Sequence, residues 1–160
     1  MPHHYYTAKT IWTGNRGHGT SEYKAYDRSH IIQMNDKTDI QGSSDAAFRG
    51  DKTKHTPEDL FVSTLSTCHM LWYLHLCAVN GVVVTAYTDE ATGILKEEAN
   101  GSGHFTEVTL NPVVTVTEKS MVEKATALHE DAHKMCFIAN SVKFPVLHKP
   151  TSLVAEKHVA

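Results

Sequence analysis

The most apolar stretch of the chain predicts a long helix from Thr56 to about Asn80. Thr56 suits an N-cap, Pro57 suits the first helical position, and two acidic residues follow in the first turn, where the helix dipole favours anions. Asn80 or Gly81 provides a suitable C-terminal stop. Residues 61–76 are apolar on nearly all sides, which is typical of a helix buried within a fold or an oligomer.

Alternating polar and apolar positions predict strands before and after this helix. Residues 9–26 alternate around the glycine-rich "GNRGHG", which suggests a hairpin or a tight bend, and residues 29–34 continue as a short strand. Residues 39–55 are rich in Gly, Ser and Asp and predict a loop. After the helix, residues 82–95 and 105–118 predict two long strands of a sheet with one covered face.

Ser120 and Glu123 form a capping-box pattern that predicts a second helix running to about Asn140. The segment 151–159 then predicts an edge strand. The resulting order is strands, helix, two strands, helix and strand, which favours an α+β fold with helices packed on antiparallel sheet. The length is typical of one domain, so we expect residues 1–160 to form a single domain.

Composition narrows the classes of function. The 15 basic and 18 acidic residues are interspersed and give a formal net charge of −3, which does not favour binding to nucleic acid. The sequence has neither an apolar run long enough for a membrane span nor the pattern of a secretory signal, so we expect a cytoplasmic protein. Three cysteines are too few for a disulfide scaffold, and any disulfide is therefore expected to be functional.

The first helix carries two of the cysteines on different faces. Cys68 and Cys77 are nine residues apart, which at about 100° per residue places them on opposite sides of the helix. His75 follows Cys68 by seven residues and lies on nearly the same face. Buried free cysteines are commonly inert, so position alone leaves open whether Cys68 is a core residue or a reactive thiol.

The third cysteine belongs to a stripe on the second helix, because His129, His133 and Cys136 follow the i, i+4, i+7 spacing. If the two helices pack together, Cys136 and Cys68 face each other. One alternative is a pair of inert buried thiols. Another is a metal site, in which this stripe and residues Cys68 and His75 supply nitrogen and sulfur ligands.

A reactive cysteine requires a stabilised thiolate, and Cys68 lies too far from the start of its helix for the dipole to help. A cation from another segment is needed. The chain has three arginines, Arg16, Arg28 and Arg49. Composition alone leaves each of them open as a surface residue.

Three segments together, "WTGNRGHGT", "TPEDLFVSTLSTC" and "HKMCFIANS", resemble the OsmC/Ohr family of thiol-dependent organic hydroperoxide reductases. The resemblance covers residues 12–150, and the ten-residue step from Glu58 to Cys68 is fairly specific. It implies an OsmC-like α+β fold of antiparallel sheets and two central buried helices. It also implies an intertwined homodimer with active sites at the subunit interface.

The resemblance also implies roles for individual residues. Cys68 matches the cysteine that attacks the peroxide, and Cys136 matches the resolving cysteine. Glu58 matches a glutamate that holds an arginine beside the thiolate. Arg16 fits the position of that arginine best, while Arg28 would serve the same electrostatic purpose. The family often has proline after the second cysteine, where this chain has a phenylalanine.

The function implied is reduction of organic hydroperoxides through a sulfenic acid at Cys68 and a disulfide between Cys68 and Cys136. An external dithiol would restore the thiols, and no cofactor or metal would be needed. An apolar surrounding would favour organic peroxides over hydrogen peroxide. The alternatives are a non-catalytic dimer that binds small molecules on the same scaffold, and the metal-binding protein described above.

Overall fold

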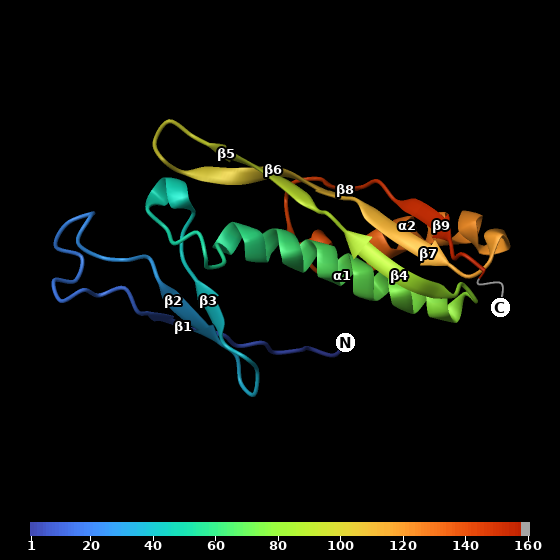
Figure 1. Cartoon of the computed structure of the whole chain (residues 1–160), viewed down its shortest axis with the longest axis horizontal. Coiled ribbons are helices and arrows are strands. Elements are labelled where there is room, and N and C mark those ends of the chain that lie inside the picture. Colours follow the sequence, from blue (N-terminus) through green and yellow to red (C-terminus); the bar gives the residue numbers. More distant parts are fainter. Residues whose placement is uncertain (158–160) are drawn as a thin grey trace. The chain divides into compact units, whose positions relative to one another are not determined.

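The computed structural model describes residues 1–157, whose course can be followed in Figure 1. The contacts of the chain divide it into two compact units, residues 1–60 and residues 61–160. Each unit is described by itself below. The sequence-based expectation of one domain across 1–160 stays a prediction.

The first unit contains a small antiparallel sheet in the order β1-β2-β3. Its strands are β1 (Lys9–Trp12), β2 (His30–Gln33) and β3 (Ile40–Gly42). The predicted strand within residues 29–34 is confirmed, but the loop expected over 39–55 contains β3 and a 3-10 turn. Residues 40–42 form a strand because they pair with β2. No hydrophobic side chain among residues 1–60 is fully buried.

The connection between β1 and β2 is a bend built on a glycine. A Cβ at Gly14 would lie 1.8 Å from the carbonyl oxygen of Asp27, so no larger residue fits. The side chain of Asn15 accepts hydrogen bonds from the backbone N–H groups of Gly17 and Gly19, at 2.9 and 3.0 Å. These contacts confirm the predicted bend around the glycine-rich segment.

Helix α1 (Pro57–Val79) begins and ends where the sequence predicts. Thr56 and Asp59 cap it reciprocally: the backbone N–H of Asp59 donates to Thr56 Oγ1 at 3.1 Å, and that of Thr56 donates to Asp59 Oδ2 at 3.0 Å. At the other end Gly81 has a φ of 72°, which permits the Val82 N–H to donate to the carbonyl of Cys77 at 2.9 Å.

Only one face of α1 is buried within the chain. The fully buried positions follow one another at intervals of four and form a single stripe: Leu65, His69, Tyr73 and Cys77. Other apolar side chains of the helix remain uncovered, and Leu71 and Val79 are 63% and 64% exposed. The helix is therefore apolar on nearly all sides, as the sequence predicts, while the described residues cover part of it.

Four strands lie between the two helices, where the sequence predicts two. They are β4 (Val84–Asp89), β5 (Thr92–Glu97), β6 (Gly103–Leu110) and β7 (Pro112–Val116). The expectation of two long strands is wrong because the chain changes sheets at two points. There the Asp89 carboxylate accepts from the Asn111 N–H at 2.6 Å and from Ser66 Oγ at 2.5 Å. A polar anchor on α1 thus fixes both breaks.

The strands of the second unit form two sheets in the orders β4-β7-β9 and β5-β6-β8. The last strands, β8 (Val146–His148) and β9 (Thr151–Val154), pair parallel to β6 and β7. The α+β class is confirmed, and the sheets are mixed rather than purely antiparallel. The strand predicted over 151–159 is present as β9, and its last two residues lie outside the described ones.

Helix α2 (Val122–Met135) is shorter than the sequence suggests. The predicted capping box is wrong: Ser120 lies in a preceding 3-10 turn, and the N-cap, Met121, makes no side-chain capping bond. The helix ends at Met135, five residues before the expected end, because Cys136 is extended, with a ψ of 111°. A 3-10 turn over Ala139–Ser141 completes the predicted segment.

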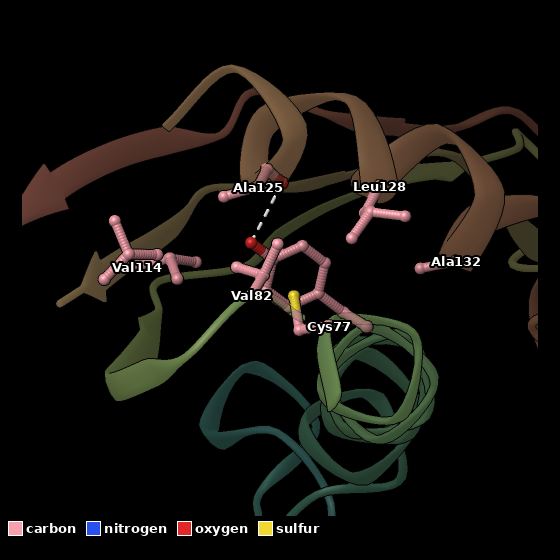
Figure 2. Close-up of a cluster of buried hydrophobic side chains, with 8 residues drawn as sticks. Cys77, Val82, Val114, Ala125, Leu128 and Ala132 are labelled. Atoms are coloured by element: carbon pink, nitrogen blue, oxygen red, sulfur yellow. Dashed lines mark hydrogen bonds between the residues drawn. The ribbon is translucent and has the colours of Figure 1, made fainter. Parts of the chain in front are cut away.

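The second unit has two buried apolar clusters. Figure 2 shows the first, in which α1, α2 and the sheet of β4 and β7 meet around Cys77, Val82, Val114 and Leu128. The Tyr73 hydroxyl donates to the carbonyl of Ala125 at 2.9 Å, which is the dashed line in that figure. The second cluster is smaller and consists of Leu65, Val108, Leu110 and Val146.

Neither helix within residues 1–157 combines the length and hydropathy of a membrane span.

Candidate functional site: two thiols beside an apolar cavity

Cys68, in the middle of α1, lies beside Cys136, the first residue after α2. Their side chains share a hydrogen bond. Cys68 is half-buried, whereas Cys136 is only 1% exposed. Burial raises the pKa of Cys136 to about 11, and the hydrogen bond and charge of Cys68 add to this increase. Cys136 is therefore a thiol at neutral pH. The facing thiols expected from the helix stripe are present.

The Cys136 sulfur is fixed by the backbone that follows it. The N–H of Ala139 donates to Cys136 Sγ at 3.4 Å, and this hydrogen bond lowers the pKa of the thiol against the effect of burial. The early end of α2 makes the contact possible, because the extended Cys136 lets the chain turn back over its own sulfur. The Cys136 sulfur is thus held in place.

Cys68 also lines a cavity of about 370 Å³. The other lining residues are Leu71, Trp72, His75 and Phe137. Trp72 and Phe137 meet edge to face, with ring centroids 5.6 Å apart, and join α1 to the segment after α2. His75 shares the cavity with Cys68, as their seven-residue spacing predicts. The volume and the largely apolar walls suit a small organic molecule.

The third cysteine lies away from this cavity and borders a separate one of about 390 Å³, with Leu74 and Val82 among its walls. Cys77 is 1% exposed and packs in the first apolar cluster, on another side of α1. Burial raises the pKa of its thiol. The predicted separation of Cys77 from Cys68 around the helix is therefore present.

The two candidate arginines make local contacts within the first unit. Arg28 lies between the rings of Tyr23 and Tyr26, at 4.5 and 4.1 Å, and donates to the backbone carbonyls of both residues. Arg16 forms an ion pair with Asp27 at 3.6 Å and donates to the carbonyl of Lys24. These contacts hold the bend between β1 and β2.

Glu58 lies in the first turn of α1 and is partly buried. Among residues 1–157, its carboxylate forms an ion pair with neither candidate arginine. The predicted roles of Glu58, Arg16 and Arg28 stay predictions.

A buried pair of histidines connects the two helices and was not predicted from the sequence. His69 Nε2 lies 3.0 Å from His129 Nδ1, and the side chains are 1% and 0% exposed. Burial lowers the pKa of His69 to about 4 and that of His129 to about 3. The available signal was the stripe with four-residue spacing on α1, which places His69 among core positions.

The metal site considered from the sequence is not assembled. Within residues 1–157, no group of three or more His, Cys, Asp or Glu side chains has the geometry to hold a metal ion. The expected ligands are separated because His129 pairs with His69, while His75 lines the cavity beside Cys68. His129, His133 and Cys136 thus contact different residues instead of sharing one metal site.

Comparison with known proteins finds OsmC-like proteins both by sequence and by structure. Residues 50–150 match the family model described as OsmC-like protein. A structure of an OsmC-like protein of unknown function from Vibrio cholerae is 30% identical, with a TM-score of 0.83 over 92% of this chain and 99% of that one. The comparison with curated proteins returns no match.

More distant structures share the fold. An organic hydroperoxide resistance protein OsmC from Legionella pneumophila is 17% identical, with a TM-score of 0.69 over 96% of this chain and 100% of that one. An organic hydroperoxide resistance protein from Elizabethkingia anophelis is 19% identical, with a TM-score of 0.66 over 95% of this chain and 99% of the other. At these identities the likeness concerns the fold alone.

Proposed function

Because the chain belongs to the OsmC family, we propose that it is a thiol-dependent peroxidase that reduces organic hydroperoxides at Cys68 and Cys136. The observation that carries the proposal is the contact of these two thiols beside an apolar cavity. One sulfur has access to a small organic molecule, and the other is buried within reach of the first. This is the arrangement that a two-cysteine peroxidase needs.

The reaction has three steps. The Cys68 thiolate attacks the terminal oxygen of the hydroperoxide; the O–O bond breaks, and the alkoxide takes a proton and leaves as an alcohol. The Cys68 sulfenic acid then reacts with Cys136: an S–S bond forms, the S–O bond breaks, and water leaves. An external dithiol reduces this disulfide by exchange and becomes a disulfide itself.

The environment of Cys136 suits its role as the second sulfur. A thiol with a high pKa is a poor nucleophile toward peroxide, so Cys136 is protected from oxidation until a sulfenic acid forms beside it. The hydrogen bond between the Cys136 and Cys68 side chains keeps the two sulfurs in contact. Arg16 or Arg28, oriented by Glu58, would place a full positive charge beside the Cys68 thiolate.

The substrate would occupy the cavity. Leu71, Trp72 and Phe137 offer apolar contacts to an organic tail, which gains by leaving water. Hydrogen peroxide has no such tail and gains nothing from these walls. We therefore expect a preference for organic hydroperoxides.

We further propose that the working form is a homodimer. The first unit has no fully buried hydrophobic side chain, although its sheet carries Ile11, Ile31 and Ile32. The outer face of α1 leaves Leu71 and Val79 exposed. Such surfaces are stabilised by a second copy of the chain. Light scattering at micromolar concentration should give the mass of a dimer, and a stable folded monomer would contradict the proposal.

The function is tested by adding one equivalent of cumene hydroperoxide to the reduced protein. We expect the loss of two free thiols per chain and, in peptide mapping, a link between Cys68 and Cys136. A Cys77→Ala variant serves as the control and should lose the same two thiols. If no thiol is lost while the hydroperoxide binds in the cavity, the chain is instead a non-catalytic binding protein on the same scaffold.

A further inference from the structure

The order of three contacts between α1 and the segment from α2 to Cys136 shows how the two helices are aligned. Tyr73 donates to the carbonyl of Ala125, His69 pairs with His129, and Cys68 meets Cys136. The residue numbers fall along α1 as they rise along α2, so the helices run in opposite directions along this contact. The histidine pair is therefore the polar contact next to the thiols.

The histidine pair is an unusual way to join two helices. A hydrogen bond between two neutral imidazoles requires one ring nitrogen to donate and the other to accept. The remaining nitrogens, His69 Nδ1 and His129 Nε2, are buried and have no hydrogen-bond partner. Unpaired buried polar atoms cost free energy, so packing alone would favour apolar residues at both positions.

The pair is enclosed by rings and has few counter-charges. Tyr73 of α1 stacks on His129, with centroids 3.8 Å apart, and His148 of β8 stacks on His69 at 5.8 Å. His133 of α2 lies 5.5 Å from His148. Among the described residues, the carboxylate paired with this cluster is that of Glu130, which lies 3.5 Å from His148 Nε2 and 3.7 Å from Lys134 Nζ.

We infer that His69 and His129 are positioning residues that hold Cys68 opposite Cys136, and that acid releases this hold. While both imidazoles are neutral, their hydrogen bond fixes the spacing of the helices. When both rings carry a proton, N–H faces N–H and two positive charges repel each other in a buried site. The contact nearest to the thiols is then lost. The inference rests on the redox role proposed for the two cysteines.

The pKa values of the pair agree with this inference. Burial lowers both values, with a further contribution from the neighbouring histidines. His148 is less buried, and its pKa is lowered by burial and by His133 but raised by Glu130. Protonation is therefore expected to begin at His148 and reach the pair last, at about pH 4 and below.

The test uses a disulfide reagent rather than a peroxide, so it can fail independently of the proposed peroxidase activity. In a Cys77→Ala background, 4,4′-dipyridyl disulfide reacts with Cys68, releasing one pyridinethiolate and leaving a mixed disulfide. Cys136 then attacks the Cys68 sulfur and releases the second pyridinethiolate, forming the protein disulfide. The absorbance of this second release measures how readily Cys136 reaches Cys68.

The reference is a His129→Asn variant. Its side-chain amide can replace His129 Nδ1 as the hydrogen-bond partner of His69 Nε2, but it does not titrate. The pH dependence of the thiols and of the reagent is common to both proteins and cancels in the ratio of their rates. We expect a ratio of wild type to variant near one from pH 7 to pH 5 that falls about twofold or more as the pH drops to 3, where both rings begin to carry protons. A ratio that stays constant over this range would overturn the inference.

A second variant and a direct measurement protect against misfolding of the first. His69→Gln places an amide where Nε2 stood and should give the same pH-dependent ratio. In the wild type, the imidazole ¹⁵N resonances of His69 and His129 should titrate well below pH 6 together with the loss of the second release. Titration near pH 6.5, as in an unperturbed imidazole, would contradict the inference without any variant.

Tyr73→Phe separates positioning from stability. This change removes a neighbouring hydrogen bond between the same helices but no titratable imidazole. If contact between the helices matters only for stability, Tyr73→Phe and wild type should differ by the same factor at pH 7 and pH 3. For His129→Asn, by contrast, the ratio of rates should change with pH. If the ratio depends on pH in the same way for both variants, the positioning role of the two histidines is wrong.

Discussion

Two thiols on α1, nine residues apart, lie in opposite kinds of surroundings. Cys77 is enclosed by the apolar side chains of α2, β4 and β7, and within the described residues neither of the other two cysteines belongs to this cluster. Cys68 borders a cavity on one side and contacts Cys136 on the other. Two cysteines on the same helix thus have different neighbours and can take part in different reactions. The difference shows that the partners of a thiol, rather than its place on an apolar helix, decide whether it can react.

The largest effect is expected from removing the accessible thiol. Cys68→Ser should abolish consumption of organic hydroperoxide, because a serine hydroxyl does not reduce an O–O bond. The fold should remain, since Cys68 is only half-buried and serine is nearly the same size. Peroxide consumption with dithiothreitol as reductant measures the loss, and far-ultraviolet circular dichroism checks the fold. Turnover retained in this variant would exclude Cys68 as the reacting residue.

Removing the second sulfur should leave the first step intact. In Cys136→Ser the Cys68 sulfenic acid has no resolving partner, so it should persist or proceed to sulfinic acid in excess peroxide. We expect one rapid oxidation per chain followed by a strong fall in sustained turnover. Intact-mass spectrometry should find additions of one and then two oxygen atoms. An unchanged steady-state rate would mean that the contact of the two thiols has no role in turnover.

A smaller effect is expected from the cation. Arg16→Lys and Arg28→Lys keep the positive charge but lose the planar, two-point contact with a carboxylate such as Glu58. We expect the peroxidase rate to fall about tenfold or more in the variant of whichever arginine acts, and little in the other. Each variant is the control for its partner. If both rates match the wild type, electrostatic activation by these arginines is wrong.

Stability should depend on pH through the buried pair of His69 and His129. The pKa of His69 is lowered from 6.5 to about 4, so the unfolded chain binds this proton more readily than the folded one. The folded state therefore loses free energy of unfolding as pH falls from about 6.5 to 4, by about 1.4 kcal/mol per pH unit for each such histidine. Urea unfolding should show a weaker acid loss in His129→Asn. Parallel curves would contradict the low histidine pKa values.

The two thiols also show how far the sequence leads. Local rules predict α1 because its caps are short-range: Thr56 and Asp59 bond each other, and Gly81 closes the end. The angular separation of Cys68 and Cys77 follows from helix geometry alone. The proximity of Cys136 to Cys68 required a packing assumption, and the family resemblance supported it.

Other features depend on contacts that are distant in sequence. The strand breaks near Asp89 and Asn111 depend on a hydrogen bond between these two residues, which are 22 positions apart. The alternating pattern of the sequence continues through both breaks and therefore does not reveal them. Helix α2 ends at Met135, although "CFIAN" continues a helical pattern, because the chain turns back onto the Cys136 sulfur. The pairing of His69 with His129 spans 60 residues and left no local signal of a partner.

The smallest effect on activity is expected at the enclosed thiol, and it completes the comparison. Cys77→Ala removes one sulfur atom from a filled cluster, which should lower the free energy of unfolding by about 1 kcal/mol through lost contacts and a small cavity. Peroxide turnover should stay close to that of the wild type, because Cys77 neither lines the cavity beside Cys68 nor contacts Cys136. Urea unfolding and peroxide consumption, measured on the same preparation, separate the two quantities. A large fall in turnover with unchanged stability would mean that Cys77 takes part in the chemistry, and the contrast between the two thiols would then be lost.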